Sequence, residues 1–441
     1  MIKTAKKLIL LELNEINFDI VEKYLAADST RFPSLKKLLA GPQIRTSCEK
    51  QYEELEPWIQ WASVHTGKTY AEHGIFRLGD MVDSGVSQIF EQLEQVGYKV
   101  GAISPMNAEN RLKHPAYFIP DPWTHTPTDS SWWSQSLSRA ISQTVNDNAK
   151  ARISAKSALQ LALGLFRFAR ISHYGKYLSL VVGSRRKSWL RPLVLDLLLH
   201  DVHWSMFNNK KPNFSTLFLN AGAHIQHHYF FNAEPVVKNS TIKNPAWYIA
   251  EDEDPLADVL GLYDMIVGEY FARSDTDVLL ATGLTQKPYD SVKFYYRLNN
   301  HAAFLQGLAI KFKDVLPRMT RDFLIEFENK HQAIVSQSIL ANVTVGESET
   351  PLFGEIDNRG DSLFVTLTYP REINDSTYYC VGAFKAPLLP NVSFVAIKNG
   401  MHQDEGYAFF TPGIAPYAPA EKAHVAKLGT SIRDYFGITA D

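Results

Sequence analysis

The sequence has few cysteines, little net charge and no long uninterrupted hydrophobic run. Its 441 residues include 2 cysteines, too few for a disulfide framework or a four-thiolate zinc site. Lys and Arg number 45 and Asp and Glu number 47, which gives a net charge of −2 and argues against a protein that coats nucleic acid. No stretch of about 18 uncharged apolar residues occurs. Glu12 and Glu15 interrupt the first apolar run before a signal-peptide pattern is complete. We therefore expect a soluble, cytoplasmic protein without a nucleic-acid partner.

Hydrophobic residues make up 45% of the chain, which is enough for a substantial core. Several continuous apolar runs end in polar residues, as strands buried on both faces of a parallel sheet do. Three of these runs are 7–14, 215–220 and 276–282. Stretches with helical spacing, such as 16–25, alternate with them, and this predicts a doubly wound, mostly parallel α/β sheet. Ligands of such sheets bind beyond the carboxyl ends of the strands, which directs attention to Asn14, Glu15, 220–228 and Thr282.

Two stretches depart from the α/β pattern. From Lys150 to Leu195 there are ten basic residues and no acidic one, interleaved with Leu, Phe, Trp and Tyr. This favours equally a basic amphipathic insertion, over 136–210, that contacts an anionic membrane surface or a polyanionic substrate, and a helical cap with a solvated basic face. The second departure, 316–388, predicts a β-rich insertion. The α/β core then comprises 1–135, 211–315 and 389–441.

Three motifs in the core resemble the alkaline phosphatase superfamily, particularly its type I phosphodiesterase/nucleotide pyrophosphatase and sulfatase-like branch. They are Pro57-Trp58-Ile59-Gln60-Trp61-Ala62-Ser63-Val64-His65-Thr66-Gly67-Lys68 with Glu72-His73-Gly74-Ile75-Phe76, then His224-Ile225-Gln226-His227, then Gly400-Met401-His402-Gln403-Asp404-Glu405-Gly406. Their order along the chain also agrees with that family. The resemblance implies an alkaline-phosphatase-like fold. In that family two divalent metals, held by carboxylates and histidines, assist a Thr or Ser nucleophile.

The residues that carry the family's chemistry are largely replaced. Asn14 stands where the resemblance implies an Asp, and Pro57 stands at the nucleophile position. Ala223 replaces a further Asp, and the segment 281–284 lacks the Asp and His of the family's "SDHG" element. His227 and His402 remain, and both contribute to one metal site in the family. A site with so few anionic ligands does not balance two nearby divalent ions, so we expect a family fold with a rebuilt site.

The segment from Ala223 to Tyr229 has the highest density of histidines in the chain. If it opens a helix, His224 and His228 lie one turn apart, and His227 lies beside His224. This i, i+4 spacing suits a metal ion such as zinc. Neutral imidazoles equally suit acid–base catalysis or anion binding. A third interpretation is that some of these histidines only form hydrogen bonds in a polar core.

These considerations give a set of candidate site residues. The candidate catalytic residues are His227, His402, Glu56 and Glu15. The candidate metal ligands are His224, His227 and His402, and the implied cofactor is one divalent metal such as zinc or manganese. The candidate substrate-binding residues are Asn14, His228, Trp58 and Thr282.

The expected function is that of a phosphodiesterase/sulfatase-like enzyme with a rebuilt site. Its substrate class is phosphorylated or nucleotide-activated, such as a nucleotide sugar or a glycan. It acts as a hydrolase or as a transferase, for example in surface-polysaccharide biosynthesis, and the basic insertion would bring it to a membrane. The alternative is a catalytically silent relative that binds a glycan or a protein partner.

Overall fold

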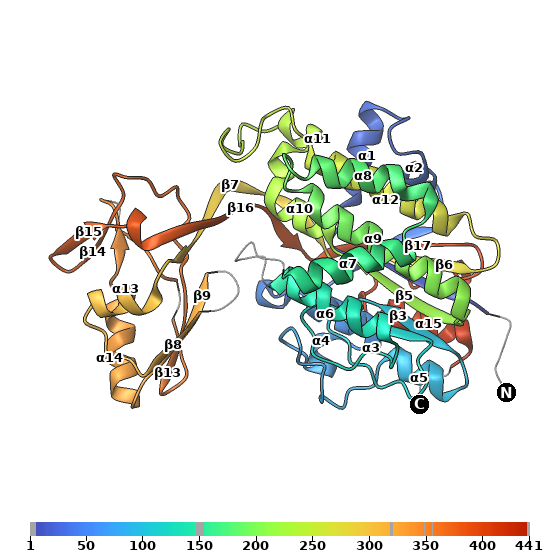
Figure 1. Ribbon diagram of the computed structural model, residues 1–441, viewed down its shortest axis with the longest axis horizontal. Helices are drawn as coiled ribbons and strands as arrows, with labels where there is room; N and C mark the ends of the chain where they lie inside the picture. The colour runs from blue at the N-terminus through green and yellow to red at the C-terminus, as the bar shows by residue number, and fades with distance from the viewer. Residues whose placement is uncertain (1–5, 147–153, 318–320, 348, 355, 439–441) are drawn as a thin grey trace. The chain divides into compact units, whose positions relative to one another are not determined.

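The computed structural model describes residues 6–146, 154–317, 321–347, 349–354 and 356–438. The chain divides into two compact units (Figure 1). The first unit comprises 1–241, 245–288 and 400–441, and the second comprises 242–244 and 289–399. The stretch predicted as a β-rich insertion thus falls within the second unit.

A seven-stranded sheet forms the centre of the first unit. In spatial order its strands are β2 (Gln43–Ser47), β17 (Glu405–Phe410), β6 (Asp277–Ala281), β1 (Leu8–Leu13), β5 (Phe214–Leu219), β3 (Val100–Ile103) and β4 (Tyr117–Ile119). The five strands from β6 to β4 run parallel, whereas β17 pairs antiparallel with both β6 and β2. The predicted α/β class with a mostly parallel sheet is confirmed.

Helices cover both faces of this sheet. Alternate side chains of the central strand β1 point to opposite sides, and each set packs against the helices on its own side. Ile9 and Leu11 pack into one hydrophobic cluster and Leu8 and Leu10 into the other. On the first side lie α1 (Phe18–Ala27), α2 (Pro33–Leu39), α6 (Trp132–Asn146), α7 (Ala155–Phe168), α8 (Tyr174–Gly183), α9 (Leu190–Lys210), α10 (Ala221–Tyr229), α11 (Glu234–Val237) and α12 (Pro255–Phe271). On the second side lie α3 (Pro57–Thr66), α5 (Ile89–Gln95) and α15 (Lys427–Phe436), with α4 (Tyr70–His73) packed on α3.

The ends of one helix follow directly from its sequence. Pro57 occupies the first turn of α3, where its missing N–H is not needed. Gly67 ends α3 in the left-handed region at φ 69°, which costs little only for glycine. In the described residues no helix combines the length and the apolar character that crossing a bilayer requires.

In its described residues the second unit contains two four-stranded antiparallel sheets and two α-helices. One sheet has the order β12 (Asp357–Asn358), β13 (Ser362–Thr366), β9 (Asp322–Glu326) and β8 (Asp314–Pro317). The other has the order β11 (Thr350–Pro351), β10 (Thr344–Val345), β14 (Tyr378–Val381) and β15 (Phe384–Pro387). The helices are α13 (His301–Gly307) and α14 (Lys330–Ala341), and β7 (Thr285–Leu298) pairs with β16 (Val392–Gln403).

Candidate functional site

Three candidate side chains from distant parts of the sequence meet at the carboxyl ends of the parallel strands. Glu15 follows β1, and His227 lies on α10, which begins directly after β5. His402 lies at the end of β16, just before β17. Because β17 runs antiparallel to β6, the residues that precede β17 reach the same sheet edge as the residues that follow β6. The topology therefore brings Glu15, His227 and His402 together, and we call them the Glu–His–His triad.

The donor atoms of the triad form a nearly equilateral triangle. The Nε2 atoms of His227 and His402 each lie 3.2 Å from Oε2 of Glu15, and they lie 3.3 Å from each other. A tetrahedral zinc ion with bonds of 2.0–2.1 Å holds its ligand atoms about 3.3–3.4 Å apart. The spacing in the triad thus fits one such ion, and a carboxylate with two imidazoles is an established ligand set for catalytic zinc with one position left open.

The second ring nitrogen of each histidine faces an acceptor, which determines where the proton resides. Nδ1 of His227 donates to the carbonyl oxygen of Gly400 at 3.2 Å. Nδ1 of His402 faces the Glu56 carboxylate at 3.8 Å, which favours a proton on that nitrogen. A metal ion between the three groups would replace the protons on both Nε2 atoms and bind their lone pairs, as in metal-binding histidines.

Glu15 is held rigidly by backbone and side-chain contacts. Its φ of 62° lies in the left-handed region, an uncommon conformation for a residue other than glycine. Its N–H donates to the carbonyl of Thr282 at 3.0 Å, and its carbonyl accepts from Gln226 Nε2 at 2.6 Å. One carboxylate oxygen accepts from Asn14 Nδ2 at 3.0 Å and the other from Gln286 Nε2. The carboxylate is therefore fixed before any ligand arrives.

Electrostatics keep this carboxylate ionised although it is buried. Burial by itself raises the pKa of Glu15, but the positive charge and hydrogen bonds of His402 and His227 in their protonated form outweigh burial and hold the pKa well below its usual range. The side chain of Glu15 is 2% exposed, whereas those of His227 and His402 are 21% and 13% exposed. The carboxylate of the triad is therefore buried, and the two histidines are the members of the triad that solvent reaches.

Asn14 and Thr282, predicted to bind substrate, lie in the interior. Asn14 is 1% exposed and Thr282 is fully buried. Asn14 Nδ2 also donates to Asn220 at 2.8 Å, and Asn14 Oδ1 accepts from Trp61 Nε1 at 2.7 Å. The Thr282 hydroxyl accepts the N–H of Tyr407 at 2.9 Å. The structure thus places both side chains in contact with the protein itself, where they support the site from below.

His224, His228 and Trp58 lie outside the triad. The segment 221–229 does form the predicted helix, and the rings of His224 and His228 are 4.7 Å apart, centroid to centroid. In the described residues the group of potential ligands at this edge contains Glu15 rather than His224. The indole N–H of Trp58 donates to the backbone carbonyl of Phe76 at 3.0 Å.

A second group of titratable residues carries no recognisable signal in the sequence. His173 Nδ1 and Arg170 Nε each lie 2.8 Å from Oδ1 of Asp201, and His200 Nε2 lies 2.7 Å from Glu269. Burial alone would lower the pKa of His173, but the two carboxylates outweigh burial and raise the pKa to about 9. The guanidinium of Arg170 also contacts Glu269 and both imidazoles. It supplies the positive charge that a metal would otherwise supply, so we assign this group a structural role.

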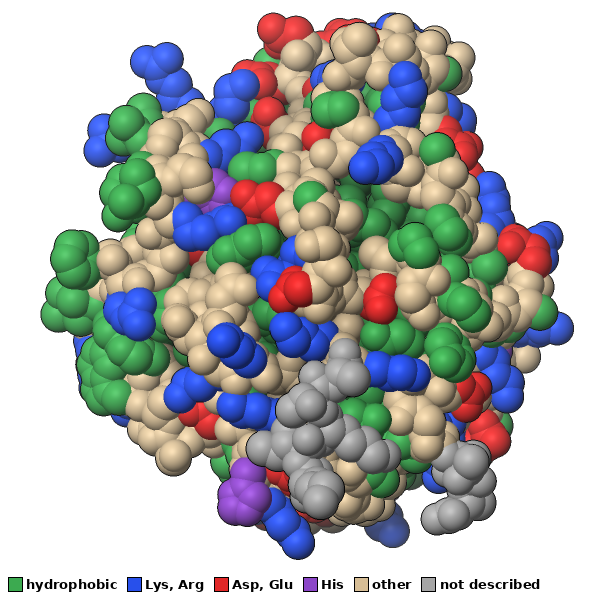
Figure 2. Space-filling view, turned by 90° about the vertical axis from the view of Figure 1, so that its right-hand side faces the viewer, with side chains coloured by type: hydrophobic (Ala, Val, Ile, Leu, Met, Phe, Trp, Pro, Cys, Tyr) green, Lys and Arg blue, Asp and Glu red, His purple; other side chains and the backbone are tan. Residues whose placement is uncertain are grey.

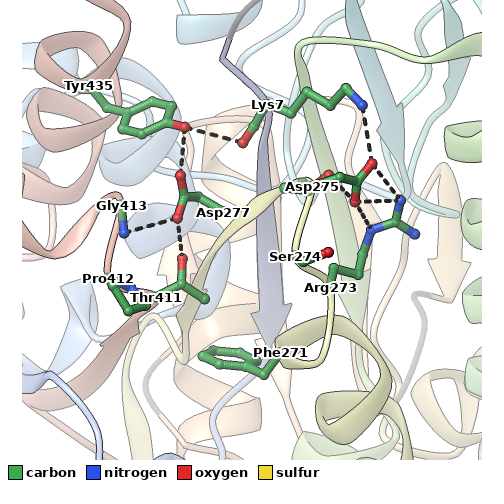
Figure 3. A pocket seen from close by; sticks show the side chains of 11 residues that line it. Lys7, Phe271, Arg273, Ser274, Asp275, Asp277, Thr411, Pro412, Gly413 and Tyr435 are labelled. Atoms are coloured by element: carbon green, nitrogen blue, oxygen red, sulfur yellow. Dashed lines mark hydrogen bonds and ion pairs between the residues drawn. The ribbon is translucent and has the colours of Figure 1, made fainter.

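A surface hollow of about 340 Å³ lies at the opposite end of the strands (Figure 3). It is lined by Lys7 and Asp277, at the amino ends of β1 and β6. Asp277 accepts from Tyr435 at 2.8 Å and from Thr411 at 2.7 Å, and Asp275 pairs with Lys7 at 3.1 Å. These polar groups contact one another, and ligands of parallel sheets bind at the other end. The hollow is therefore separate from the triad.

No family model and no curated protein matches the chain. Comparison with solved structures finds phosphonoacetate hydrolase from Sinorhizobium meliloti at 11% identity and a TM-score of 0.38, covering 98% of this chain and 96% of that one. It also finds murine ectonucleotide pyrophosphatase/phosphodiesterase 5 (10%, TM-score 0.46, 99% and 96%) and TAB5 alkaline phosphatase (9%, TM-score 0.41, 100% and 100%). All three are alkaline phosphatase superfamily members. This chain carries Asn14 and Pro57 at the positions where the sequence resemblance implies an Asp and a hydroxyl nucleophile.

Proposed function

We propose that the chain is a phosphodiesterase/sulfatase-like enzyme that works with one divalent metal, zinc or manganese, held by the Glu–His–His triad. The observation that carries this proposal is the convergence of one buried carboxylate oxygen and two imidazole Nε2 atoms within 3.3 Å of one another. Three electron-rich atoms at this spacing repel each other unless a cation or a proton lies between them. The other ring nitrogen of each histidine, Nδ1, faces an acceptor oxygen. A proton on each Nδ1 makes Nε2 the nitrogen that can bind a cation.

The charge of the site suits an anionic substrate. A divalent ion bound by one carboxylate and two neutral imidazoles would give the site a charge of about +1. When bound, such an ion polarises a phosphoryl oxygen and makes a nearby water more acidic. A phosphate ester, a nucleotide-activated sugar or a sulfate ester would approach from the side of the two partly exposed histidines.

The protein has no nucleophilic side chain at the position where the resemblance implies one. The attacking group therefore has to be a water or a hydroxyl of an acceptor molecule. Pro57 has no hydroxyl group, so a covalent intermediate on this residue is excluded. Glu56 precedes it, and its side chain is 33% exposed. We assign Glu56 the role of general base that accepts the proton of an attacking water or of an acceptor hydroxyl. Attack by water makes the enzyme a hydrolase, and attack by a hydroxyl of a glycan makes it a transferase in surface-polysaccharide biosynthesis.

Metal content is the first test. Purified protein is loaded with zinc or manganese, dialysed and analysed by mass spectrometry of the metals. We expect about one ion per chain, lost in His227→Gln and in His402→Gln. His224→Gln is the matched control, because it lies on the same helix one turn away and outside the triad. Equal loss of metal in His224→Gln would show that the ligand set is different.

Activity is the second test. The loaded protein is assayed with p-nitrophenyl phosphate, bis-p-nitrophenyl phosphate and p-nitrophenyl sulfate, and then with nucleotide sugars in the presence and absence of glycan acceptors. We expect turnover of at least one phosphate ester that depends on His227 and His402. A metal-loaded protein that turns over none of these substrates would contradict the enzyme and would favour the silent glycan-binding or protein-binding relative.

A further inference from the structure

A second surface of the first unit carries exposed hydrophobic side chains at unusual density. Of the seventeen large hydrophobic side chains that are exposed in the described part of the chain, eight lie between Leu159 and Val182. The most exposed are Phe166 at 86%, Ile171 at 84% and Leu178 at 66%. Single exposed hydrophobic residues are ordinary, but a concentrated group of them marks an interaction surface. We call α7, α8 and the 3-10 turn between them (Ile171–His173) the α7–α8 hairpin.

In α7 the apolar residues lie on the face that points away from the protein. Leu159, Leu163 and Phe166 follow the i, i+4, i+7 spacing of one helix face. The opposite face buries Gly164 and Phe168 against α6 and α9. An amphipathic helix in a water-soluble domain normally turns its polar face outward. Here α7 packs through one apolar face and presents a second apolar face to the outside.

The second helix repeats this arrangement. Tyr174, Leu178 and Val181 are exposed and share one face of α8 by the same spacing. Tyr177 and Leu180 are buried where α8 packs on α9. Both helices of the hairpin therefore rest on α9 and turn apolar side chains outward.

The turn between the two helices is fixed to the body of the unit. Arg170 pairs with Asp201 at 2.8 Å, and His173 pairs with Glu269 at 3.1 Å. These partners lie on α9 and α12. Ile171, between the two anchored residues, is thereby held with its side chain outward. The exposed residues of the turn belong to a rigid element with its own ion pairs.

The charged side chains that the hairpin itself contributes are all basic. The sequence from Lys150 to Leu195 contains no acidic residue. Lys156 and Arg167 flank the outward face of α7, and Arg185 and Arg186 follow α8, all four being exposed. Figure 2 shows hydrophobic side chains that protrude at the margin of the molecule with Lys and Arg close by. Apolar side chains bordered by cations are the composition of segments that lie in the interface of an anionic bilayer.

We infer that the α7–α8 hairpin docks the protein on a membrane surface rich in anionic lipids, with Phe166, Ile171 and Leu178 inserted among the acyl chains and the flanking cations at the headgroups. The charge pattern argues against a second copy of the chain as the occupant, because a two-fold interface places identical patches against each other and would bring the arginines of both copies together. Lys and Arg satisfy both layers of a bilayer interface, since their stems are apolar and their heads are charged.

The test is cosedimentation of the full chain with vesicles of phosphatidylcholine alone or mixed with phosphatidylglycerol. We expect binding to the mixed vesicles, weakened by salt, and little binding to the neutral ones. Phe166→Ser with Leu178→Ser should weaken binding by about tenfold or more for each residue. Removal of each cation should weaken it by about fivefold, so Arg185→Gln with Arg186→Gln should weaken it by about 25-fold.

The matched control is Ile334→Ser with Val335→Ser, which removes two exposed hydrophobic side chains (59% and 46%) from α14 in the second unit. It should leave vesicle binding unchanged. Three results would overturn the inference. They are no binding to the mixed vesicles, equal loss of binding in the control, and a concentration-dependent dimer in light scattering that Phe166→Ser dissociates. The last result would assign the surface to a second copy of the chain.

Discussion

Replacing Asn14 by Asp tests the immediate surroundings of the triad with a change of one functional group. Asn14 Nδ2 donates to Glu15 at 3.0 Å and to Asn220 at 2.8 Å. An ionised Asp at this position has no donor and places a second negative charge next to Glu15. Asn14 is 1% exposed, so water does not take over the lost hydrogen bonds. We expect Asn14→Asp to destabilise the metal-free protein.

The size of the effect has a natural upper limit. Two adjacent carboxylates relieve their repulsion when one of them takes up a proton, and at pH 7 this costs about 4 kcal/mol for a group of ordinary pKa, because each pH unit corresponds to about 1.4 kcal/mol. The protonated group donates to only one of the two former acceptors, and an unsatisfied buried acceptor costs about 1–3 kcal/mol. The cost of proton uptake, about 4 kcal/mol at pH 7, is the most that the repulsion can contribute. Structural relaxation lowers the cost of the unsatisfied acceptor. We therefore expect the free energy of unfolding to fall by about 3–5 kcal/mol at pH 7 and by about 3 kcal/mol less at pH 5.

The assay is urea unfolding of the wild type and Asn14→Asp with a chelator, at pH 5 and pH 7, and again with zinc. A divalent ion in the triad should recover part of the loss, because it attracts the new carboxylate. The control is Asn208→Asp on α9, since Asn208 is exposed and its Oδ1 accepts from Arg273. This change keeps the acceptor and should alter stability by less than about 0.5 kcal/mol. A loss in Asn14→Asp below about 1 kcal/mol at pH 7, or one that does not depend on pH, would refute the reasoning.

Three further changes test other parts of the protein. Gly400→Ala places a Cβ 2.8 Å from the carbonyl oxygen of Gln226, so it should lower stability by about 1–3 kcal/mol and weaken metal binding; unchanged values in urea unfolding and zinc titration would contradict this. His173→Gln should remove a stabilisation on the order of 2 kcal/mol that is complete below about pH 6.5 and is lost as the pH rises through about 9, so wild type and variant should converge in urea unfolding above pH 9. Glu56→Gln should keep the metal and lower kcat by about 10²–10⁴-fold, with loss of the acidic limb of the pH–rate profile; an unchanged profile would remove Glu56 from the chemistry.

The position of the site can be predicted from the sequence because it depends on strand ends. Apolar runs that stop at a polar residue identify strands buried on both faces, and their carboxyl ends share one edge. This pattern by itself assigns Glu15 and His227 to the same edge of the sheet. His402 is found through its motif, and the antiparallel β17 explains how a residue near the end of the chain arrives there.

The ligand set cannot be predicted to the same degree, because it depends on backbone conformations that local patterns do not reveal. Glu15 reaches the histidines only because its φ is positive, whereas its place in the sequence favours a helix-capping role equally well. Gln286 follows β6 after a tight turn and holds Glu15, and nothing near it in the sequence indicates this contact. The helical spacing to His228 favours His224 as a ligand, but a metal site needs donor atoms that converge on one point. Which helix residue converges with Glu15 and His402 depends on where those two residues lie, and local spacing does not show this.

The balance of charge around Glu15 determines how many ions the site holds. Asn14 and Gln286 donate to its two oxygens, and amides stabilise a carboxylate without adding charge. In the described residues the group of potential ligands around Glu15 contains no other carboxylate. Two divalent ions about 4 Å apart would repel each other by about 16 kcal/mol at an effective dielectric constant of 20, and a single carboxylate offsets only part of this. We therefore expect one ion in the wild type and a measurable increase in Asn14→Asp at high metal concentration; two ions in the wild type would show that another anionic group completes the site.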